Sequence, residues 1–155
     1  MHTQLKPLKR HTALQPLSRE HHFGLLLCWK IQMGFRKNID PKRIRVYADW
    51  FYKNHLIPHF EIEETHVFTI LEKDDKLIKK ALADHRRIKR LFAETNDDAI
   101  TLNKIEETLE QHIRFEERVL FPEIQKIATE AQMLQIEKTH QAENFKDNLD
   151  DAFWK

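Results

Sequence analysis

The sequence predicts an all-α fold, specifically an antiparallel up-down four-helix bundle with an additional C-terminal helix. The chain of 155 residues contains two Gly and five Pro, so it is poor in the residues that make turns. Hydrophobic residues form 41% and charged residues 33% of the chain, a composition typical of helices when it is rich in Lys, Glu, Leu and Ile. Apolar residues recur at helical spacing in five segments. The length favours one domain with one core.

The first predicted helix begins near Pro16 or Ser18 and ends at about Lys37. At about 100° per residue, one stripe of this helix contains Leu17, His21, Gly24, Cys28, Ile31 and Phe35. His22 points well away from the stripe, although a rotated helix would exchange it for His21. We therefore expect His21 to face the core, with His22 as the alternative.

The second predicted helix starts at Pro41, because Asp40 is a suitable N-cap and Pro is favoured at the first helical position. Pro58 lies inside this helix and removes a backbone hydrogen bond, so we expect a kink next to His59. The inward face contains Ala48, Tyr52, Leu56, His59, Glu63 and Val67.

The third and fourth predicted helices each follow a polar turn, at 74–75 and at 95–98. The inward stripe of the third helix contains Ile78, Ala81, His85, Ile88 and Phe92. The fourth helix meets Pro122, and its inward stripe contains Ile105, Leu109, His112, Glu116 and Val119. Each of the first four helices therefore carries an inward histidine.

The fifth predicted helix begins at about Thr129 and leads toward an aromatic C-terminus. It carries Met133, Ile136, His140 and Phe145 toward Phe153 and Trp154. Because the connections are short, we expect four antiparallel helices with the fifth packed alongside. The predicted organisation is a basic N-terminal arm, 1–13, which includes Lys6, Lys9 and Arg10, followed by a helical bundle domain, 14–155.

The charge pattern argues against nucleic acid or a membrane as a partner. The 26 basic and 25 acidic residues give a net charge of +1 with His neutral. No run approaches the roughly 18 apolar residues of a membrane span, and nothing before Leu14 resembles an apolar signal core. The lone Cys28 excludes an intramolecular disulfide and suits a reducing compartment. We expect a soluble, cytoplasmic protein.

A ten-residue pattern occurs twice, at 59–68 and at 112–121, and reads H-φ-x-φ-E-E-x-x-φ-F, where φ is apolar. In each copy the His and the first Glu, His59 with Glu63 and His112 with Glu116, are four residues apart, so they lie on one face of a helix. A neutral imidazole and a carboxylate that project side by side from two helices make half of a metal cage.

Four inward histidines and two inward glutamates would be costly in an apolar core. A buried neutral His needs a hydrogen-bond partner, and a buried carboxylate costs far more unless it is paired or bound to metal. A pair of metal ions offsets this cost, so the metal interpretation outweighs the alternative in which each polar group is satisfied separately. The candidate ligands are His21, His59, Glu63, His85, His112 and Glu116.

Other polar residues compete for this role. Glu63-x-x-His66 and Glu137-x-x-His140 have a spacing used in ferritin-like di-iron bundles, but that cage leaves three inward histidines unexplained. The remaining residues are expected to have no ligand role: His55 beside the site or at the surface, Glu64 and Glu117 pointing outward to solvent or Arg, and Cys28 packed as a small apolar residue.

The order of these residues resembles the hemerythrin-like (HHE) cation-binding family: His, then H-x-x-x-E, then His, then H-x-x-x-E on four successive helices. The resemblance covers roughly 14–125 and is carried by Leu17-Ser-Arg-Glu-His21 and His59-Phe-Glu-Ile-Glu-Glu64. It implies a bundle with two iron ions in an oxo- or hydroxo-bridged non-haem centre, although manganese or zinc also suits such ligands. It implies that one iron is held by His21 and His59, the other by His85 and His112, with Glu63 and Glu116 as bridges.

The chain also departs from the hemerythrins that carry oxygen, which have a second His four residues from the third-helix ligand. The matching neighbours of His85 are Ala81 and Lys89. Four His and two Glu would leave open positions on each metal, which favours reactive chemistry over reversible oxygen carriage. This pattern of open metal positions is similar to that of the iron-centre repair and nitrosative-stress branch of the family.

Three functions are compatible with this sequence. The first is a di-iron protein that binds or senses O₂, nitric oxide or iron, with a small diatomic ligand or peroxide as its partner. The second is a redox enzyme or iron-centre repair protein that acts on peroxide, nitric oxide or damaged iron centres. The third is a metal-free helical module that docks a protein partner through its aromatic C-terminus.

Overall fold

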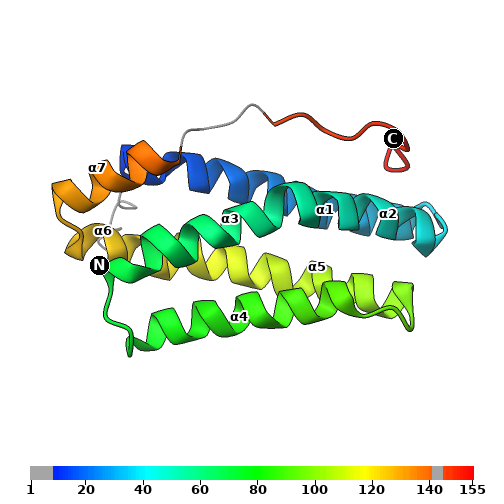
Figure 1. Cartoon of the computed structure of the whole chain (residues 1–155). Helices are drawn as coiled ribbons and strands as arrows, with labels where there is room; N and C mark the ends of the chain where they lie inside the picture. Colours follow the sequence, from blue (N-terminus) through cyan, green and yellow to red (C-terminus); the bar gives the residue numbers. More distant parts are fainter. Residues whose placement is uncertain (1–8, 141–144) are drawn as a thin grey trace, which may run out of the picture.

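The computed structural model describes residues 9–140 and 145–155, and within these ranges its regular elements are helices, as predicted. Four long segments lie side by side along a common direction (Figure 1). The first is α1 (Gln15–Arg36), preceded by a 3₁₀ turn, η1 (Thr12–Leu14). The second consists of α2 (Pro41–Phe51), η2 (Tyr52–Leu56), α3 (Ile57–Ile62), η3 (Glu63–Val67) and η4 (Phe68–Ile70). The third is α4 (Lys76–Ala93), the fourth consists of α5 (Asp98–Phe115), η5 (Glu116–Leu120) and α6 (Phe121–Ile127), and α7 (Glu130–Thr139) follows.

Side-chain caps confirm where the predicted helices begin. The Asp40 carboxylate accepts a hydrogen bond from a backbone N–H in the first turn of α2 (3.0 Å). Asp75 caps α4 and Asp97 caps α5 in the same way. Thr129 begins α7 with a capping box. These side chains satisfy N–H groups that a helix leaves without an internal partner, which is why short polar turns suffice to separate the helices.

Three turns, η2, η3 and η5, are π-helical, so an N–H bonds to the carbonyl five residues earlier. In η2 the Ile57 N–H donates to the Tyr52 carbonyl, directly before Pro58. The same bond in η5 precedes Pro122. Because Pro lacks an N–H and its ring crowds the preceding turn, a wider turn is favoured there. A π turn therefore ends directly before Ile57 and Pro58, while the kink expected next to His59 stays a prediction.

The π turn η5 corrects one predicted core position. Uninterrupted α-helical spacing places Val119 on the inward face, but Val119 is 44% exposed. A π turn contains one residue more than an α turn, so the inward position passes to Leu120, which is fully buried. Val67, which occupies the same position in the first pattern copy as Leu120 does in the second, is also fully buried.

The apolar core consists of two clusters separated by a polar layer. Members of the first cluster include Leu27, Ile31, Phe60, Ile88 and Leu109. Members of the second include Leu14, Leu17, Val67, Ile78 and Leu120. Each long segment contributes to both clusters and has one or two buried polar residues at the boundary between them. The fold thus brings polar side chains from four segments into one layer.

The end of the chain departs from the prediction. α7 ends at Thr139, so the expectation that the fifth helix continues to Phe145 is wrong; the backbone is already extended at the next residue. Residues 145–155, named the C-terminal segment below, run alongside α1 and α2 (Figure 1). Phe153 and Trp154 are buried in the first cluster, so the aromatic end closes the protein's own core.

The described part of the predicted basic arm packs against the bundle, whereas Lys6 lies outside the described residues. The Arg10 guanidinium donates hydrogen bonds to the Glu117 carbonyl oxygen (2.8 Å) and to the Gln125 side chain (3.1 Å). None of the helices in the described ranges combines the length and apolar character that a membrane span requires.

Candidate metal centre

The six residues predicted as metal ligands converge in the polar layer between the two core clusters. Each is at most 3% exposed. Their nitrogen and oxygen atoms form two groups, and the atoms within each group lie within 4.8 Å of one another. The first group contains His21, His59, Glu63 and Glu116, and the second contains His85, His112, Glu63 and Glu116. Because both glutamates belong to both groups, the arrangement fits two cations joined by two carboxylates.

In the first group the imidazole Nε2 atoms point toward one another. The Nε2 atoms of His21 and His59 are 3.1 Å apart. Glu116 Oε1 lies 2.9 Å from His21 Nε2, and Glu63 Oε2 lies 3.2 Å from His59 Nε2. Two nitrogens and two carboxylate oxygens therefore face one small space.

The second group repeats this geometry on the other pair of helices. The Nε2 atoms of His85 and His112 are also 3.1 Å apart. Glu63 Oε1 lies 3.2 Å from His85 Nε2, and Glu116 Oε1 lies 3.0 Å from His112 Nε2. The repeated sequence pattern thus becomes a repeated donor set, with Glu63 directing one oxygen to each group.

A second set of carboxylates contacts the opposite nitrogen, Nδ1, of all four histidines. We name Glu20, Glu64, Asp84 and Glu117 the outer carboxylates. The Nδ1 distances are 2.7 Å for His21 to Glu117, 2.6 Å for His59 to Glu20, 2.7 Å for His85 to Glu64 and 3.0 Å for His112 to Asp84. Each Nδ1–H donates to a carboxylate, which orients the ring and leaves a lone pair on Nε2.

The outer carboxylates connect the helices in a closed ring. The outer carboxylate of one long segment contacts the histidine of the next long segment, and the carboxylate of the fourth segment contacts the histidine of the first. Glu20 of α1 holds His59 of the second segment, and Glu117 of the fourth segment holds His21 of α1. The orientation of every candidate ligand therefore depends on a neighbouring helix.

Unpartnered buried atoms indicate that this donor set suits cations. Both carboxylate oxygens of Glu63 and the Oε2 of Glu116 are buried without a hydrogen-bond donor among the described residues. With Nδ1 protonated, the four Nε2 atoms present lone pairs to the same space. Lone pairs in such close contact repel unless a proton or a metal ion lies between them. Imidazole and carboxylate donors without thiolates suit iron, manganese or zinc.

In the metal-free centre, protons take the place of cations. Burial opposes protonation of His59, but the charge of Glu63 and the hydrogen bond to Glu20 outweigh it and raise the pKa of His59 to about 9. Burial also opposes protonation of His112, but the neighbouring carboxylates outweigh it and raise the pKa of His112 to about 9, with the largest effect from Glu116. Burial would raise the pKa of Glu63, yet the surrounding histidines hold it well below its usual range.

The competing assignments lack geometric support among the described residues. His22 is exposed, whereas His21 is buried in the site. Glu137 is exposed and His66 is half-buried, and neither belongs to a group of converging ligand atoms. The structure therefore does not assemble the ferritin-like alternative in the part of the chain that it describes.

His140 supports an outer carboxylate instead of a cation. It is buried, and its Nε2 lies 2.9 Å from Glu20 Oε2. Burial would raise the pKa of Glu20, but the contacts with His140 and His59 lower it to about 2, so this carboxylate is ionised at neutral pH. Cys28 packs in the first core cluster, as expected, and burial raises the pKa of its thiol.

Sequence reasoning missed the outer carboxylates. The expected Arg partner is present at Glu117, whose Oε1 lies 3.4 Å from the Arg10 guanidinium. What the expectation lacked is that Glu64 and Glu117 also each contact Nδ1 of a candidate ligand. The signal was present in the second Glu of both pattern copies. Glu20 and Asp84 each precede an inward histidine, so their proximity to a site could also have been inferred.

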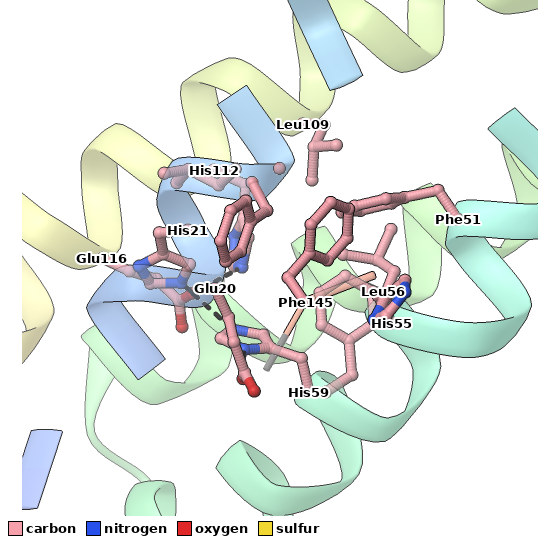
Figure 2. Close-up of a pocket in the computed structure, with 14 residues that line it drawn as sticks. Glu20, His21, Phe51, His55, Leu56, His59, Leu109, His112, Glu116 and Phe145 are labelled. Atoms are coloured by element: carbon pink, nitrogen blue, oxygen red, sulfur yellow. Dashed lines mark hydrogen bonds and ion pairs between the residues drawn. The ribbon is translucent and has the colours of Figure 1, made fainter. Parts of the chain in front are cut away.

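A small cavity adjoins the first ligand group. Its volume is about 50 Å³. Since a buried water molecule needs roughly 10–15 Å³, the space suits a diatomic molecule or a peroxide. His21, His59, His112 and Glu116 border its inner end, and most of the remaining walls are apolar (Figure 2).

The comparisons with known proteins agree with this geometry. Residues 32–124 match the family model of the hemerythrin HHE cation-binding domain. The matched range contains every candidate ligand except His21, which the fold brings to the other five. Curated proteins and solved structures gave no match. The family match, together with the buried His and Glu groups, indicates a metal-binding site, and the chain belongs to the hemerythrin HHE cation-binding domain family.

Proposed function

We propose that the protein binds two iron ions in a carboxylate-bridged non-haem centre, where it binds or senses a small molecule such as O₂ or nitric oxide. The observation that supports this proposal is the membership of both glutamates in both ligand groups, with buried oxygens that lack hydrogen-bond donors. One ion would be held by His21 and His59 and the other by His85 and His112, with Glu63 and Glu116 as bridges.

The protein's own residues orient and shield this centre. Iron, when bound, supplies the capacity to bind such ligands and to exchange electrons. The outer carboxylates keep Nδ1 of each histidine protonated and direct Nε2 inward. The two apolar clusters exclude water from both ends of the polar layer. The inner end of the cavity is lined by both histidines of the first group, by His112 of the second group and by Glu116, so an incoming molecule would reach the candidate ligands from this side.

Iron content per chain tests the proposal. Protein folded with ferrous iron without oxygen and then desalted should hold two iron ions per chain. Glu63→Gln and Glu116→Gln should each lower this value, because each removes a charged donor from both groups. Glu61→Gln, on the exposed face of α3, is the matched control and should retain both ions. Wild-type protein without iron, or bridging variants with full iron, would overturn the proposal.

A redox reaction with peroxide or nitric oxide is the second candidate function. The observation that favours it is the cavity of about 50 Å³ beside the first group, which would hold either molecule against the centre. Steady-state consumption of hydrogen peroxide and of nitric oxide should exceed that of the same amount of free iron. Equal rates would leave binding or sensing as the function.

We also infer that the four long segments form the predicted antiparallel up-down bundle with α7 alongside. Support comes from their short connections, at 37–40, 71–75 and 94–97, and from their side-by-side packing (Figure 1). An experimental structure with parallel neighbouring segments would contradict this arrangement.

A further inference from the structure

The cavity beside the candidate centre has a buried inner end and a half-buried rim. Most of its lining residues are buried, including the candidate ligands. Four lining residues are half-buried and mark the rim: Glu20, Phe23, His55 and Phe145. The rim is therefore the part of the cavity nearest to solvent, between α1 and η2.

Phe145 of the C-terminal segment lies across this rim. Its ring stacks on Phe23 of α1, with centroids 4.2 Å apart and planes 15° apart. It also contacts the ring of His55 in η2, with centroids 4.7 Å apart. Figure 2 shows Phe145 between the candidate ligand His59 and the buried Phe51. One aromatic ring thus joins both walls of the opening.

Two polar contacts fix the C-terminal segment to the helices. The Asp147 carboxylate accepts hydrogen bonds from the buried Lys30 ammonium and from the Tyr47 hydroxyl (2.5 Å for Tyr47). Asp151 accepts two hydrogen bonds from the Arg43 guanidinium, at 2.9 and 2.7 Å. Because the first anchor is two residues from Phe145, the position of this ring is set by the fold.

Building on the proposed function, we propose that Phe145 determines which small molecules reach the metal centre, and how fast. Molecules with two heavy atoms pass between the rings at the rim, whereas branched molecules are excluded until the ring moves. The phenyl ring of Phe145 carries no atom that could bind a cation, and Phe145 lines the cavity together with the candidate ligands, so its role is access and not metal binding.

Two peroxides of different size test this role. In single-turnover mixing with the ferrous protein, hydrogen peroxide should oxidise the wild-type centre much faster than tert-butyl hydroperoxide does. Phe145→Ala should raise the rate with the larger peroxide about tenfold or more, and Phe145→Trp should lower it. Leu149→Ala is the matched control, because Leu149 is 59% exposed in the same segment and does not line the cavity.

A variant at another lining residue, Gly24 of α1, should have the opposite effect to Phe145→Ala. A Cβ added at Gly24, which lines the cavity, would lie 2.7 Å from Ile113 Cδ1, another lining atom. Gly24→Ala therefore narrows the cavity and should slow oxidation by both peroxides. The proposal would be overturned if the ratio of the oxidation rates with the two peroxides were the same in all the Phe145 variants as in the wild type.

Two further measurements separate this proposal from the proposed function. Iron per chain should equal the wild-type value in every Phe145 variant. In the metal-free protein, xenon should shift the NMR signal of the Ile113 methyl groups, and Phe145→Ala should increase the rate of xenon exchange. A protein without iron would overturn the proposed function, and the xenon rates would still decide the role of Phe145. Equal xenon rates in wild type and Phe145→Ala would overturn that role.

Discussion

Glu20 directly precedes His21 in the sequence, yet its carboxylate holds His59, with Oε1 2.6 Å from the imidazole Nδ1. Asp84 of α4 behaves in the same way and holds the candidate ligand of α5 at 3.0 Å. Adjacent side chains on a helix point about 100° apart, so the neighbour of an inward histidine faces the next helix. The outer carboxylates therefore make the orientation of the candidate ligands depend on how neighbouring helices pack.

Removing one outer carboxylate should weaken metal binding without removing a ligand. Glu64→Gln keeps the shape of the side chain but loses the charge that holds Nδ1 of His85. We expect iron affinity to fall about 10–100-fold, measured by competition with a chelator. Glu61→Gln, an exposed change in the same long segment, should leave the affinity unchanged. Equal affinities for the two variants would show that the outer carboxylates do not support the ligands.

The metal-free protein should lose stability as the pH rises from about 6.5 to about 9. The pKa values of His59 and His112 are raised from 6.5 to about 9 in the folded protein. Their contribution to stability is therefore fully present below pH 6.5 and is lost as the pH rises through 9. We expect the melting temperature of the metal-free protein to fall by about 5–10 °C over this range.

The iron-loaded protein is the control for this prediction. Bound metal requires neutral imidazoles, so proton loss from the histidines no longer accompanies the rise in pH. Its melting temperature should exceed that of the metal-free protein at pH 9 and vary less with pH. A metal-free protein whose melting temperature is the same at pH 6.5 and pH 9 would contradict the raised pKa values.

The sequence predicted the helices and the convergence of the six candidate ligands because both depend on periodicity. A stripe with helical spacing identifies an inward face, and the repeated H-x-x-x-E frame places His and Glu on it. The outer carboxylates were harder, because the pattern gives the position of an acid such as Glu64 but not the neighbouring helix that its carboxylate contacts, which depends on packing. The C-terminal segment has no periodicity, so the location of Phe145 depends on tertiary contacts that no local pattern contains.

The shift of register at η5 gives a stability test with a matched pair. Leu120 is fully buried, whereas its neighbour Val119 is 44% exposed. Leu120→Ala should lower the free energy of unfolding by about 2–5 kcal/mol, and Val119→Ala should change it by about 0.5 kcal/mol or less. Urea denaturation measures both. A larger effect at Val119 would mean that the helix continues through Pro122 without the π turn.

The contact between Lys30 and Asp147 predicts that the C-terminal segment stabilises the fold. Lys30 is 2% exposed, and its ammonium lies 2.8 Å from the Tyr47 hydroxyl and 4.0 Å from the centre of the Trp154 ring. Asp147 supplies the compensating charge. Asp147→Asn leaves a buried cation without a counter-ion and should lower the free energy of unfolding by about 2–4 kcal/mol.

A double-mutant cycle separates the pair from its surroundings. Lys30→Met removes the buried charge and keeps much of the apolar volume, so the double variant Lys30→Met/Asp147→Asn should be more stable than Asp147→Asn alone. Urea denaturation of the four proteins gives the coupling free energy. Additive effects would mean that Asp147 does not neutralise Lys30, and that this pair does not anchor the segment that carries Phe145.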